Sequence, residues 1–289
     1  MREKFTAYLL LMRLDRPIGI WLLLWPTLWG LWFAAGGVPP LQVLLVFIAG
    51  TVLMRSAGCA INDYADRGFD GHVARTRARP VATGRVTPDE AVRLFVAVSL
   101  IAFGLLTSLR NTLALALAVP AALLAALYPF AKRWISMPQA VLGIAFSWGI
   151  PMGFAAVQHR VDWPLAALLM AANLCWVIAY DTWYAMVDRA DDLRIGVKSA
   201  AILFGRHDLL AIALLQAAAL LLLATAGALA GRGACYFLGL GIALALAAWQ
   251  QRMARTRAPQ ACLRAFLHNN WFGAAVFAGL ALDYALAAR

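Results

Sequence analysis

Tyr180-Asp-Thr-Trp-Tyr-Ala-Met-Val-Asp-Arg-Ala-Asp-Asp192 closes an apolar run that begins at Trp163. An apolar run of this kind is typical of a helix that crosses a membrane. Side chains three or four residues apart lie on one face of a helix, so Asp181, Asp188 and Asp192 form one acidic stripe. The sequence therefore predicts a transmembrane helix with carboxylates gathered at one end.

Three carboxylates on a single stripe repel one another, and at the end of a membrane helix they also lose hydration. Such an arrangement is stable where a cation lies between the acids. Carboxylate oxygens around an open position suit a hard cation, above all Mg²⁺, which keeps part of its water and bridges to phosphate oxygens. A solvated acidic helix end is the alternative interpretation, and the stripe alone does not separate the two.

The composition identifies an integral membrane protein. Of the 289 residues, 63% are hydrophobic and 13% are charged, whereas a soluble domain has roughly half apolar and a quarter charged residues. Many of the 11 tryptophans lie near the ends of apolar runs, as is typical of the membrane interface. The four cysteines have no paired spacing, so we interpret them as small apolar residues and expect no disulfide or zinc framework.

Nine segments are long and apolar enough to cross a bilayer, which takes about twenty residues. They are residues 18–35, 41–61, 90–109, 112–130, 138–157, 163–187, 208–230, 234–250 and 268–287. We therefore expect an all-α membrane protein, a bundle of about nine transmembrane helices in one domain over residues 1–289. The first apolar run has no cleavage site after it, so we interpret it as a retained helix and not as a signal peptide.

The basic residues predict the orientation. Of the 25 Lys and Arg residues, 20 fall in one set of alternate loops and four in the other, and Arg55 remains near a helix end. Because positively charged loops stay in the cytoplasm, we expect a cytoplasmic N-terminus and a C-terminus on the other side. This topology explains the net charge of +11 without nucleic acid. The predicted location is the cell inner membrane.

Another acidic group, the first along the chain, follows the second span, so the stripe of Asp181, Asp188 and Asp192 is the second acidic group. Asn62, Asp66 and Asp70 recur every four residues, and two nearby glycines weaken a helix there, so Asp70 is expected close to or beyond the helix end. Two long polar connections, residues 62–89 and 188–207, leave spans two and six on the same side of the membrane, and such connections are usually functional. We expect them to form a cytoplasmic cap in which the two acidic groups face each other.

The two acidic motifs resemble those of the UbiA family of intramembrane aromatic prenyltransferases. The motifs are Asn-Asp-x-x-Asp-x-x-x-Asp at 62–70 and Asp-x-x-Tyr-Ala-Met-x-Asp-x-x-Asp-Asp at 181–192. Further similar stretches are Arg13-Leu-Asp-Arg-Pro-Ile-Gly19, Leu24-Trp-Pro-Thr-Leu-Trp29, Arg55-Ser-Ala-Gly-Cys-Ala-Ile-Asn-Asp-Tyr-Ala-Asp-Arg67, Tyr128-Pro-Phe-Ala-Lys-Arg133 and Gly196-Val-Lys-Ser-Ala-Ala-Ile-Leu-Phe-Gly205. Trp183 and Ala190 stand where the family pattern leads us to expect Gln and Asp.

The resemblance implies a nine-span helical bundle, a cytoplasmic cap and a Mg²⁺-dependent enzyme. It implies transfer of a polyprenyl group from polyprenyl diphosphate to the ring carbon of 4-hydroxybenzoate ortho to the hydroxyl, with release of diphosphate, in ubiquinone synthesis. It places Mg²⁺ and diphosphate on Asn62, Asp66, Asp70, Asp188 and Asp192. The expected partners are these two substrates and the lipid bilayer, and no required protein partner is evident.

Side chains near the motifs suit the chemistry of a diphosphate leaving group. Cationic side chains neutralise phosphate oxygens, and the candidates are Arg67, Arg133, Arg194 and Lys198. A dry aromatic pocket stabilises a cation-like allylic carbon, and the candidates are Tyr64, Tyr128, Tyr184 and Trp183. We interpret the remaining arginines of the first long loop, among them Arg75, Arg77 and Arg79, as topology residues.

The acceptor needs two further contacts. A carboxylate is expected to draw or orient the phenol proton, and Asp181 or Asp188 is the candidate. A cation is expected to bind the acceptor carboxylate, and Arg16 or Arg133 is the candidate. Asp66 and Asp188 are the acids that we expect to be indispensable for turnover.

Two alternatives stay open at this point. Within the same superfamily the acceptor is a naphthoate, a chlorophyllide, a haem or a lipid glycerol backbone in other members. A cation or organic-ion transporter belongs to a different class, and it should carry ionisable residues near the bilayer midplane. Here the acids gather at one face of the membrane, which favours an interfacial enzyme.

Overall fold

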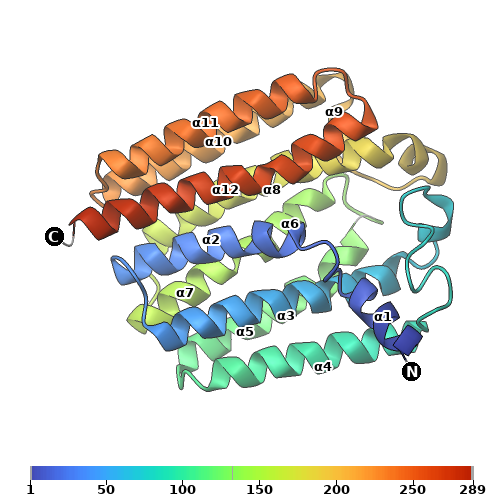
Figure 1. Cartoon of the computed structure of the whole chain (residues 1–289), viewed down its shortest axis with the longest axis horizontal. Coiled ribbons are helices and arrows are strands. Elements are labelled where there is room, and N and C mark those ends of the chain that lie inside the picture. Colours follow the sequence, from blue (N-terminus) through green and yellow to red (C-terminus); the bar gives the residue numbers. More distant parts are fainter. Residues whose placement is uncertain (1, 132, 288–289) are drawn as a thin grey trace.

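The computed structural model describes residues 2–131 and 133–287, so Lys132 and Arg289, which we counted among the loop cations, lie outside it. The described residues form helices, turns and short connections, with no strand. Figure 1 shows the long helices packed side by side, with the two termini at opposite ends of the bundle. Within the described residues, nine helical segments are long and apolar enough to cross a membrane, which confirms the predicted number.

The spans follow the predicted order. They are α2 (Ile18–Ala35), α3 (Leu41–Asp66), α4 (Pro88–Thr107), α5 (Thr112–Ala131), α6 and α7 (Pro138–Ser147 and Gly149–Gln158), α8 (Trp163–Ile195), α9 and α10 (Ala200–Phe204 and Asp208–Leu229), α11 (Ala234–Met253) and α12 (Pro259–Ala287). The other elements are α1 (Arg2–Leu11) and the 3-10 turns η1 (Asp70–His72) and η2 (Gly205–His207).

Span six extends beyond its predicted end at residue 187. We expected a polar loop from residue 188, whereas α8 continues to Ile195. The whole acidic stripe from Asp181 to Asp192 therefore lies on one rigid helix. At the second span the prediction for the helix end is confirmed, because α3 ends at Asp66 and Asp70 begins the separate turn η1.

Local sequence signals explain several helix ends. Thr87 forms a capping box with Glu90, in which each side chain binds the other residue's backbone N–H at the start of α4. Gly36 and Gly196 end α2 and α8 in the left-handed conformation, with φ values of 63° and 73°. Residues with a β-carbon rarely adopt this conformation, so glycine stops these two helices without strain.

The fifth span is broken, which the sequence analysis did not predict. Helix α6 ends at Ser147 and α7 begins at Gly149. Pro151 has no N–H to donate to the carbonyl four residues earlier, which is that of Ser147. The Ser147 side chain separately bonds back to its own helix, because its hydroxyl donates to Gly143 O at 2.7 Å. The break brings Gly149 against α2, where an added β-carbon would lie 2.8 Å from Thr27 Oγ1.

The centre of the bundle is an aromatic core between α2, α8 and α12. The Trp29 and Trp176 rings lie 5.3 Å apart between centroids. The indole of Trp176 donates to Asn269 Oδ1 at 3.0 Å, and that of Trp25 donates to Asn270 Oδ1 at 2.9 Å. These bonds satisfy the polar edges of the buried Trp176 and the half-buried Trp25, and they connect the first, sixth and last spans.

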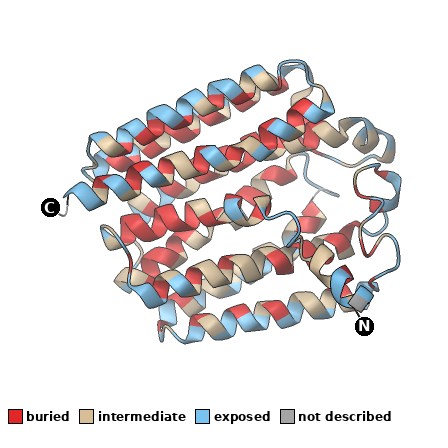
Figure 2. Cartoon of the chain, viewed as in Figure 1, coloured by how far each residue is buried: buried red, intermediate tan, exposed pale blue. Residues whose placement is uncertain are grey.

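The outer helices present apolar side chains to their surroundings. Figure 2 shows exposed residues along the outer helices. On α5 only 11% of the span is buried within the protein, against 67% on α2. Exposed residues such as Leu100, Leu123, Leu221 and Leu238 would be unfavourable in water, and lipid is the solvent that suits them. The chain is therefore a multi-pass membrane protein.

The connections after α3 and α8 lie at the same end of the bundle as α1 (Figure 1). At the same end, the buried carboxylate of Asp208 accepts hydrogen bonds from Arg189 at 2.5 Å and from Arg257 at 2.9 Å. These two ion pairs fasten α8 and the α11–α12 connection to the start of α10. Helix α1, which we did not predict, is held on α4 by Lys4, whose Nζ lies 2.7 Å from Glu90 Oε2.

Candidate active site

A cavity of about 1010 Å³ opens inside the bundle. Side chains of α2 to α8 and α12 line it, together with residues of the connection between α3 and α4. Charged and amide groups gather near the C-terminal end of α3, and apolar groups line the remainder. The apolar lining includes Phe47, Leu106, Leu142, Phe146 and Met152. The cavity is therefore amphipathic, as a site for a molecule with a charged head and an apolar tail must be.

Three carboxylates of the first acidic group converge on one guanidinium. Arg79 Nη1 lies 3.0 Å from Asp70 Oδ1, 3.4 Å from Asp63 Oδ1 and 3.7 Å from Asp66 Oδ2. All three carboxylates are buried. Asn62, on the same helical face as Asp66, donates to Asp66 Oδ2 at 3.1 Å. The family resemblance placed Mg²⁺ on Asn62, Asp66 and Asp70; in this structure Arg79 lies among the carboxylates, and Asp63, which was not predicted, joins them.

Burial and charge act against each other at this cluster. Burial raises the pKa of Asp70 above its usual value, and the neighbouring Arg79 guanidinium partly offsets that rise. Burial alone would lower the pKa of Arg79, but the carboxylates of Asp63, Asp70 and Asp66 outweigh burial and raise it. Because an arginine is already protonated at every physiological pH, Arg79 is a permanent counter-ion of the cluster.

Arg75 forms an ion pair with Asp188 of the second acidic group. Its Nε lies 3.0 Å from Asp188 Oδ1 and 3.1 Å from Oδ2. Its two terminal nitrogens donate to Asp188 and to the Tyr184 hydroxyl, and its guanidinium lies 4.3 Å from the centroid of the Tyr184 ring. A guanidinium that contacts both carboxylate oxygens forms the strong, directional kind of ion pair.

Both arginines belong to one short segment after η1. The Thr76 hydroxyl donates to Asp70 O at 3.0 Å, and Ala74 N donates to Asp191 Oδ2 on α8 at 3.2 Å. The segment is thus anchored to both acidic helix ends, and it presents Arg79 to one and Arg75 to the other. This corrects our interpretation of Arg75 and Arg79 as topology residues.

The connection between α1 and α2 adds a third arginine to the first group. Arg13 Nη2 donates to Asp63 Oδ1 at 2.7 Å, so Asp63 is shared between Arg13 and Arg79. Arg16, a predicted ligand of the acceptor carboxylate, also lines the cavity. Its side chain is 78% exposed and pairs with Asp15 at 3.4 Å, so Arg16 lies at the mouth of the cavity and not inside it.

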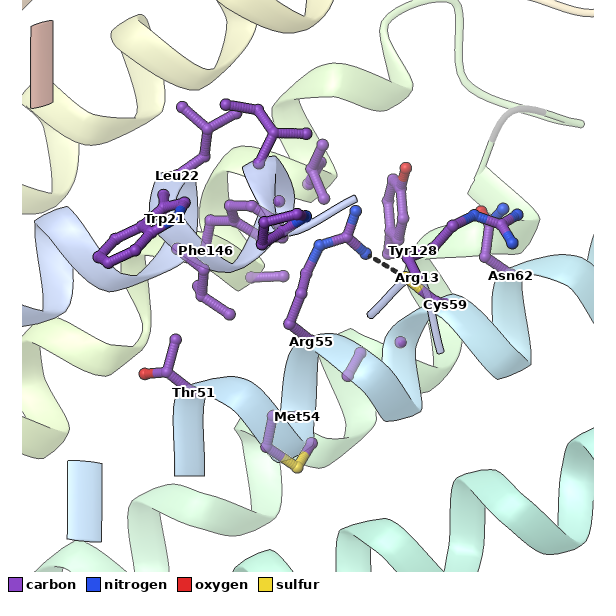
Figure 3. Close-up of a pocket in the computed structure, with 18 of the residues that line it drawn as sticks. Arg13, Trp21, Leu22, Thr51, Met54, Arg55, Cys59, Asn62, Tyr128 and Phe146 are labelled. Carbon is purple, nitrogen blue, oxygen red and sulfur yellow. Dashed lines mark hydrogen bonds between the residues drawn. The ribbon is translucent and has the colours of Figure 1, made fainter. Parts of the chain in front are cut away.

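Arg55 points into the cavity from the middle part of α3 (Figure 3). Its Nη1 donates to Cys59 Sγ at 2.8 Å, and its Nε is buried without a hydrogen-bond partner. Within the described residues Arg55 forms no ion pair. A thiol is a weak acceptor, so this guanidinium retains most of its capacity to bind an anion. We expected Arg55 near a helix end, but α3 continues for about three turns beyond it.

Two predicted aromatic residues and one predicted acid line the cavity. Tyr128 and Tyr184 lie on its wall together with Tyr180, and Asp181 is half-buried beside them. Trp183 is fully buried in the core between helices and does not line the cavity. Tyr64 also lies outside the lining and packs against the apolar contact between α1 and α3.

Four predicted cations lie outside the cavity lining. Arg67, Arg194 and Lys198 are exposed. Arg133 is closer to the first acidic group, since its Nη2 donates to Ala65 O at 2.7 Å, one residue before Asp66. These four side chains surround the acidic end of the bundle, and they remain predicted ligands at its rim.

Asp192 lies one turn beyond Asp188 on α8 and is half-buried. Its backbone carbonyl accepts from Val197 N at 3.0 Å, as part of the turn that ends the helix. Asp192 thus extends the predicted acidic stripe toward the connection after α8.

The sequence pattern and the geometry agree with one protein family, whose model, the UbiA prenyltransferase family, matches residues 23–276. The chain belongs to this family. It is similar to the 4-hydroxybenzoate octaprenyltransferases of Azoarcus sp. (strain BH72), with 58% identity over 284 residues that cover 98% of each chain, and of Aeromonas salmonicida (strain A449), with 57% identity over 99% of this chain and 98% of the relative.

Solved UbiA structures share the fold. The apo structure of a UbiA homolog from Aeropyrum pernix K1 is 28% identical, with a TM-score of 0.81 over 92% of this chain and 97% of that chain. A UbiA homolog from Archaeoglobus fulgidus bound to GPP and Mg²⁺ is 17% identical, with a TM-score of 0.70 over 95% of this chain and 99% of that chain. At the latter identity the likeness shows the fold alone.

The donor chemistry of this UbiA site fits a hard divalent cation. Oxygens of Asp63, Asp66 and Asp70 surround a single point, which a guanidinium nitrogen now occupies. Asp63 Oδ2 is buried and has no hydrogen-bond partner among the described residues. With the arginines in place, no three His, Cys, Asp or Glu side chains of the described chain are grouped as metal ligands. The carboxylates are therefore suitable ligands in chemical type, and Arg79 lies among them.

Proposed function

We propose that this protein transfers a polyprenyl group from polyprenyl diphosphate to 4-hydroxybenzoate, at the ring carbon ortho to the hydroxyl and meta to the carboxylate, and releases diphosphate. One observation carries this proposal: a single cavity joins a polar end, lined by Asn62, Asp63, Arg75 and Arg79, to an apolar chamber that contains the guanidinium of Arg55. The names of the highly similar relatives support 4-hydroxybenzoate as the acceptor and ubiquinone biosynthesis as the setting.

The diphosphate belongs at the acidic end. Mg²⁺ would be held by Asn62, Asp66, Asp70, Asp188 and Asp192, and it would neutralise the charge that grows on the leaving diphosphate. The Archaeoglobus fulgidus homolog bound to GPP and Mg²⁺ supports this cofactor. Arg75 and Arg79 stand beside the same acids, and planar guanidinium groups bind phosphate oxygens well.

Bond changes take place where the two ends of the cavity meet. The bond between the allylic carbon and the diphosphate oxygen breaks, and the acceptor ring carbon bonds to the allylic carbon. That ring carbon then loses its proton to the released diphosphate. The rings of Tyr128 and Tyr184 would stabilise the cation-like carbon. The apolar lining excludes water that would otherwise capture it. Asp181, on the cavity wall, is the proposed acceptor of the phenol proton.

Arg55 is the proposed ligand of the acceptor carboxylate, in preference to the two arginines we first considered. Arg16 is largely exposed, and Arg133 does not line the cavity. Within the described residues the Arg55 guanidinium has no ion pair, and its buried Nε has no hydrogen-bond partner. An incoming carboxylate would satisfy it. A carboxylate on Arg55 would direct the phenol end of the acceptor away from this guanidinium.

The same proposal includes the position of the polyprenyl tail and the orientation of the protein in the membrane. The polyprenyl tail lies in the apolar chamber and continues into the lipid. The one domain of residues 1–289 sits in the cell inner membrane, with the N-terminus, the active site and a cap formed by the connections after α3 and α8 on the cytoplasmic side. The excess of Lys and Arg in these connections supports that orientation.

A direct assay tests the proposal. Purified full-length protein in detergent is given Mg²⁺, a labelled polyprenyl diphosphate and, in separate reactions, 4-hydroxybenzoate, phenol, a dihydroxynaphthoate or no acceptor. We expect a ring-prenylated product with 4-hydroxybenzoate, and none when EDTA removes the divalent cation. Efficient prenylation of the naphthoate with no product from 4-hydroxybenzoate would overturn the assigned acceptor.

A further inference from the structure

Arg79 lies at the point where the carboxylates of Asp63, Asp66 and Asp70 converge. We infer that Arg79 is a positioning residue that serves as the internal counter-ion of the first acidic group, and that it must leave before a divalent cation can enter. Metal and diphosphate then bind together, because the diphosphate gives Arg79 a new partner. The inference rests on the proposed function in one respect, namely that a diphosphate is the anion that enters this site.

Distances make the two states mutually exclusive. Arg79 Nη1 lies within 3.7 Å of carboxylate oxygens from Asp63, Asp66 and Asp70. A Mg²⁺ ion needs oxygens at about 2.0–2.1 Å in a nearly octahedral arrangement. A guanidinium at the centre of the same oxygens leaves no room for the ion, and two cations at one point repel each other.

The neighbouring cation Arg13 determines which acids are released. Arg13 pairs with Asp63 at 2.7 Å, a shorter distance than the 3.4 Å from Arg79 to the same oxygen. When Arg79 departs, Asp63 therefore keeps a counter-ion. Asp70 loses its 3.0 Å ion pair, and Asp66 its 3.7 Å one. The Arg79 ion pairs with Asp70 and Asp66 are therefore the ones that an entering metal ion must replace.

The segment that carries Arg79 allows such an exchange of partners. Arg79 and Arg75 are four residues apart in an irregular connection, and each pairs with a different acidic helix end. A diphosphate between those ends offers several charged oxygens to both guanidinium groups. The exchange replaces carboxylate partners by phosphate partners, so no arginine is left buried and unpaired.

This arrangement couples the two ligands thermodynamically. Metal alone must break the Arg79 ion pairs without compensation, and so binds weakly. Metal with diphosphate breaks the same pairs but forms new ones, and so binds tightly. A coupling between two ligands typically changes affinity by about 5- to 150-fold, and it is reciprocal.

The test measures metal binding without any turnover. Mn²⁺ serves as the probe, and its binding to full-length protein in detergent is followed by electron paramagnetic resonance. The variants are Arg79→Gln, which removes the cation, and Arg79→Lys, which keeps it. Arg77→Gln is the matched control, because Arg77 lies in the same segment, is exposed and does not line the cavity.

Without pyrophosphate, we expect Arg79→Gln to bind Mn²⁺ at least about tenfold more tightly than the wild type. Arg79→Lys and Arg77→Gln should stay within about twofold of the wild type. Inorganic pyrophosphate should strengthen Mn²⁺ binding more in the wild type than in Arg79→Gln, after correction for Mn²⁺–pyrophosphate in solution. Unchanged or weaker Mn²⁺ binding by a folded Arg79→Gln protein would overturn the inference.

A second measurement on the wild type covers the case in which Arg79→Gln does not fold. Ligands that bind the native state raise its unfolding temperature. We expect Mn²⁺ alone to change this temperature little, and Mn²⁺ with pyrophosphate to raise it clearly. An equal rise with Mn²⁺ alone would contradict the proposed coupling. Neither experiment contains an aromatic acceptor, so failure of the coupling leaves the proposed prenyl transfer intact, and absence of prenyl transfer leaves the coupling intact.

Discussion

Arg55 packs against the backbone of Gly19 so closely that a β-carbon on Gly19 would lie 2.3 Å from Arg55 Nε. The glycine of α2 therefore makes the space in which the guanidinium rests. Because the blocked group is the end of a flexible side chain, a methyl group there should displace Arg55 and leave the fold in place. The contact thus relates a backbone position on one helix to the proposed acceptor site on another.

We predict that Gly19→Ala raises KM for 4-hydroxybenzoate by roughly 10- to 100-fold, because a small misplacement of a binding group has effects of this size. KM for the polyprenyl diphosphate should stay within about twofold. Steady-state kinetics with each substrate varied in turn provides the measurement. Gly104→Ala on α4 is the control, since nothing lies within 4 Å of its β-carbon position. An unchanged KM for both substrates in Gly19→Ala would refute the predicted displacement.

Arg55→Gln should lower kcat/KM for 4-hydroxybenzoate by at least about 30-fold, since loss of one partner from a buried charge pair costs about 2 kcal/mol or more. The ratio of activity toward 4-hydroxybenzoate and toward phenol separates a carboxylate contact from general damage. Phenol has no carboxylate, so its kcat/KM should change little and the ratio should fall. A parallel loss for both acceptors would argue against Arg55 as the carboxylate ligand.

Asp66→Ala and Asp188→Ala should each abolish prenyl transfer in membranes while protein levels stay close to normal. Each acid is a proposed ligand of Mg²⁺, and each also contacts an arginine of the segment after η1. Product formation from a labelled donor measures the effect, and immunoblotting measures the amount of protein. Arg160→Ala, in a connection with no part in the cavity, should retain most activity. Full activity in either aspartate variant would contradict the assigned site.

Asp208→Asn should destabilise the protein without changing substrate affinity. Asp208 is fully buried between Arg189 and Arg257, and breaking a buried pair from one side costs about 3–5 kcal/mol. We expect the unfolding midpoint in detergent to fall by on the order of 10 °C. Glu3→Gln, at an exposed position, should leave it almost unchanged. A similar midpoint for both variants would show that the Asp208 pairs contribute little.

The transmembrane architecture could be predicted from sequence because lipid leaves few choices. Backbone groups in the bilayer must bond within their own segment, so long apolar runs become helices. The alternation of basic and neutral loops then limits the number of crossings. The acidic faces of α3 and α8 followed from helical spacing alone, and Asp66 and Asp188 lie where that spacing placed them.

The roles of the arginines could not be predicted in the same way. Arg75 and Arg79 lie in an irregular segment, where no periodicity indicates the direction of a side chain. The one available signal was their spacing of four residues, equal to that of Asp66 and Asp70. The position of Arg55 was misjudged for another reason. The predicted span ended at residue 61, whereas α3 continues to Asp66, so we expected this guanidinium near the helix end and not inside the bundle.

The attachment of α1 has a practical consequence for handling the protein. Lys4 and Tyr8 both hold Glu90, and the chain then leads directly to Arg13 on Asp63. We expect a bulky affinity tag fused ahead of α1 to disturb the contacts of Lys4 and Tyr8 with Glu90, and through them the ion pair between Arg13 and Asp63. A tag after α12, at the opposite end of the bundle (Figure 1), is the better choice for purification and for any binding measurement.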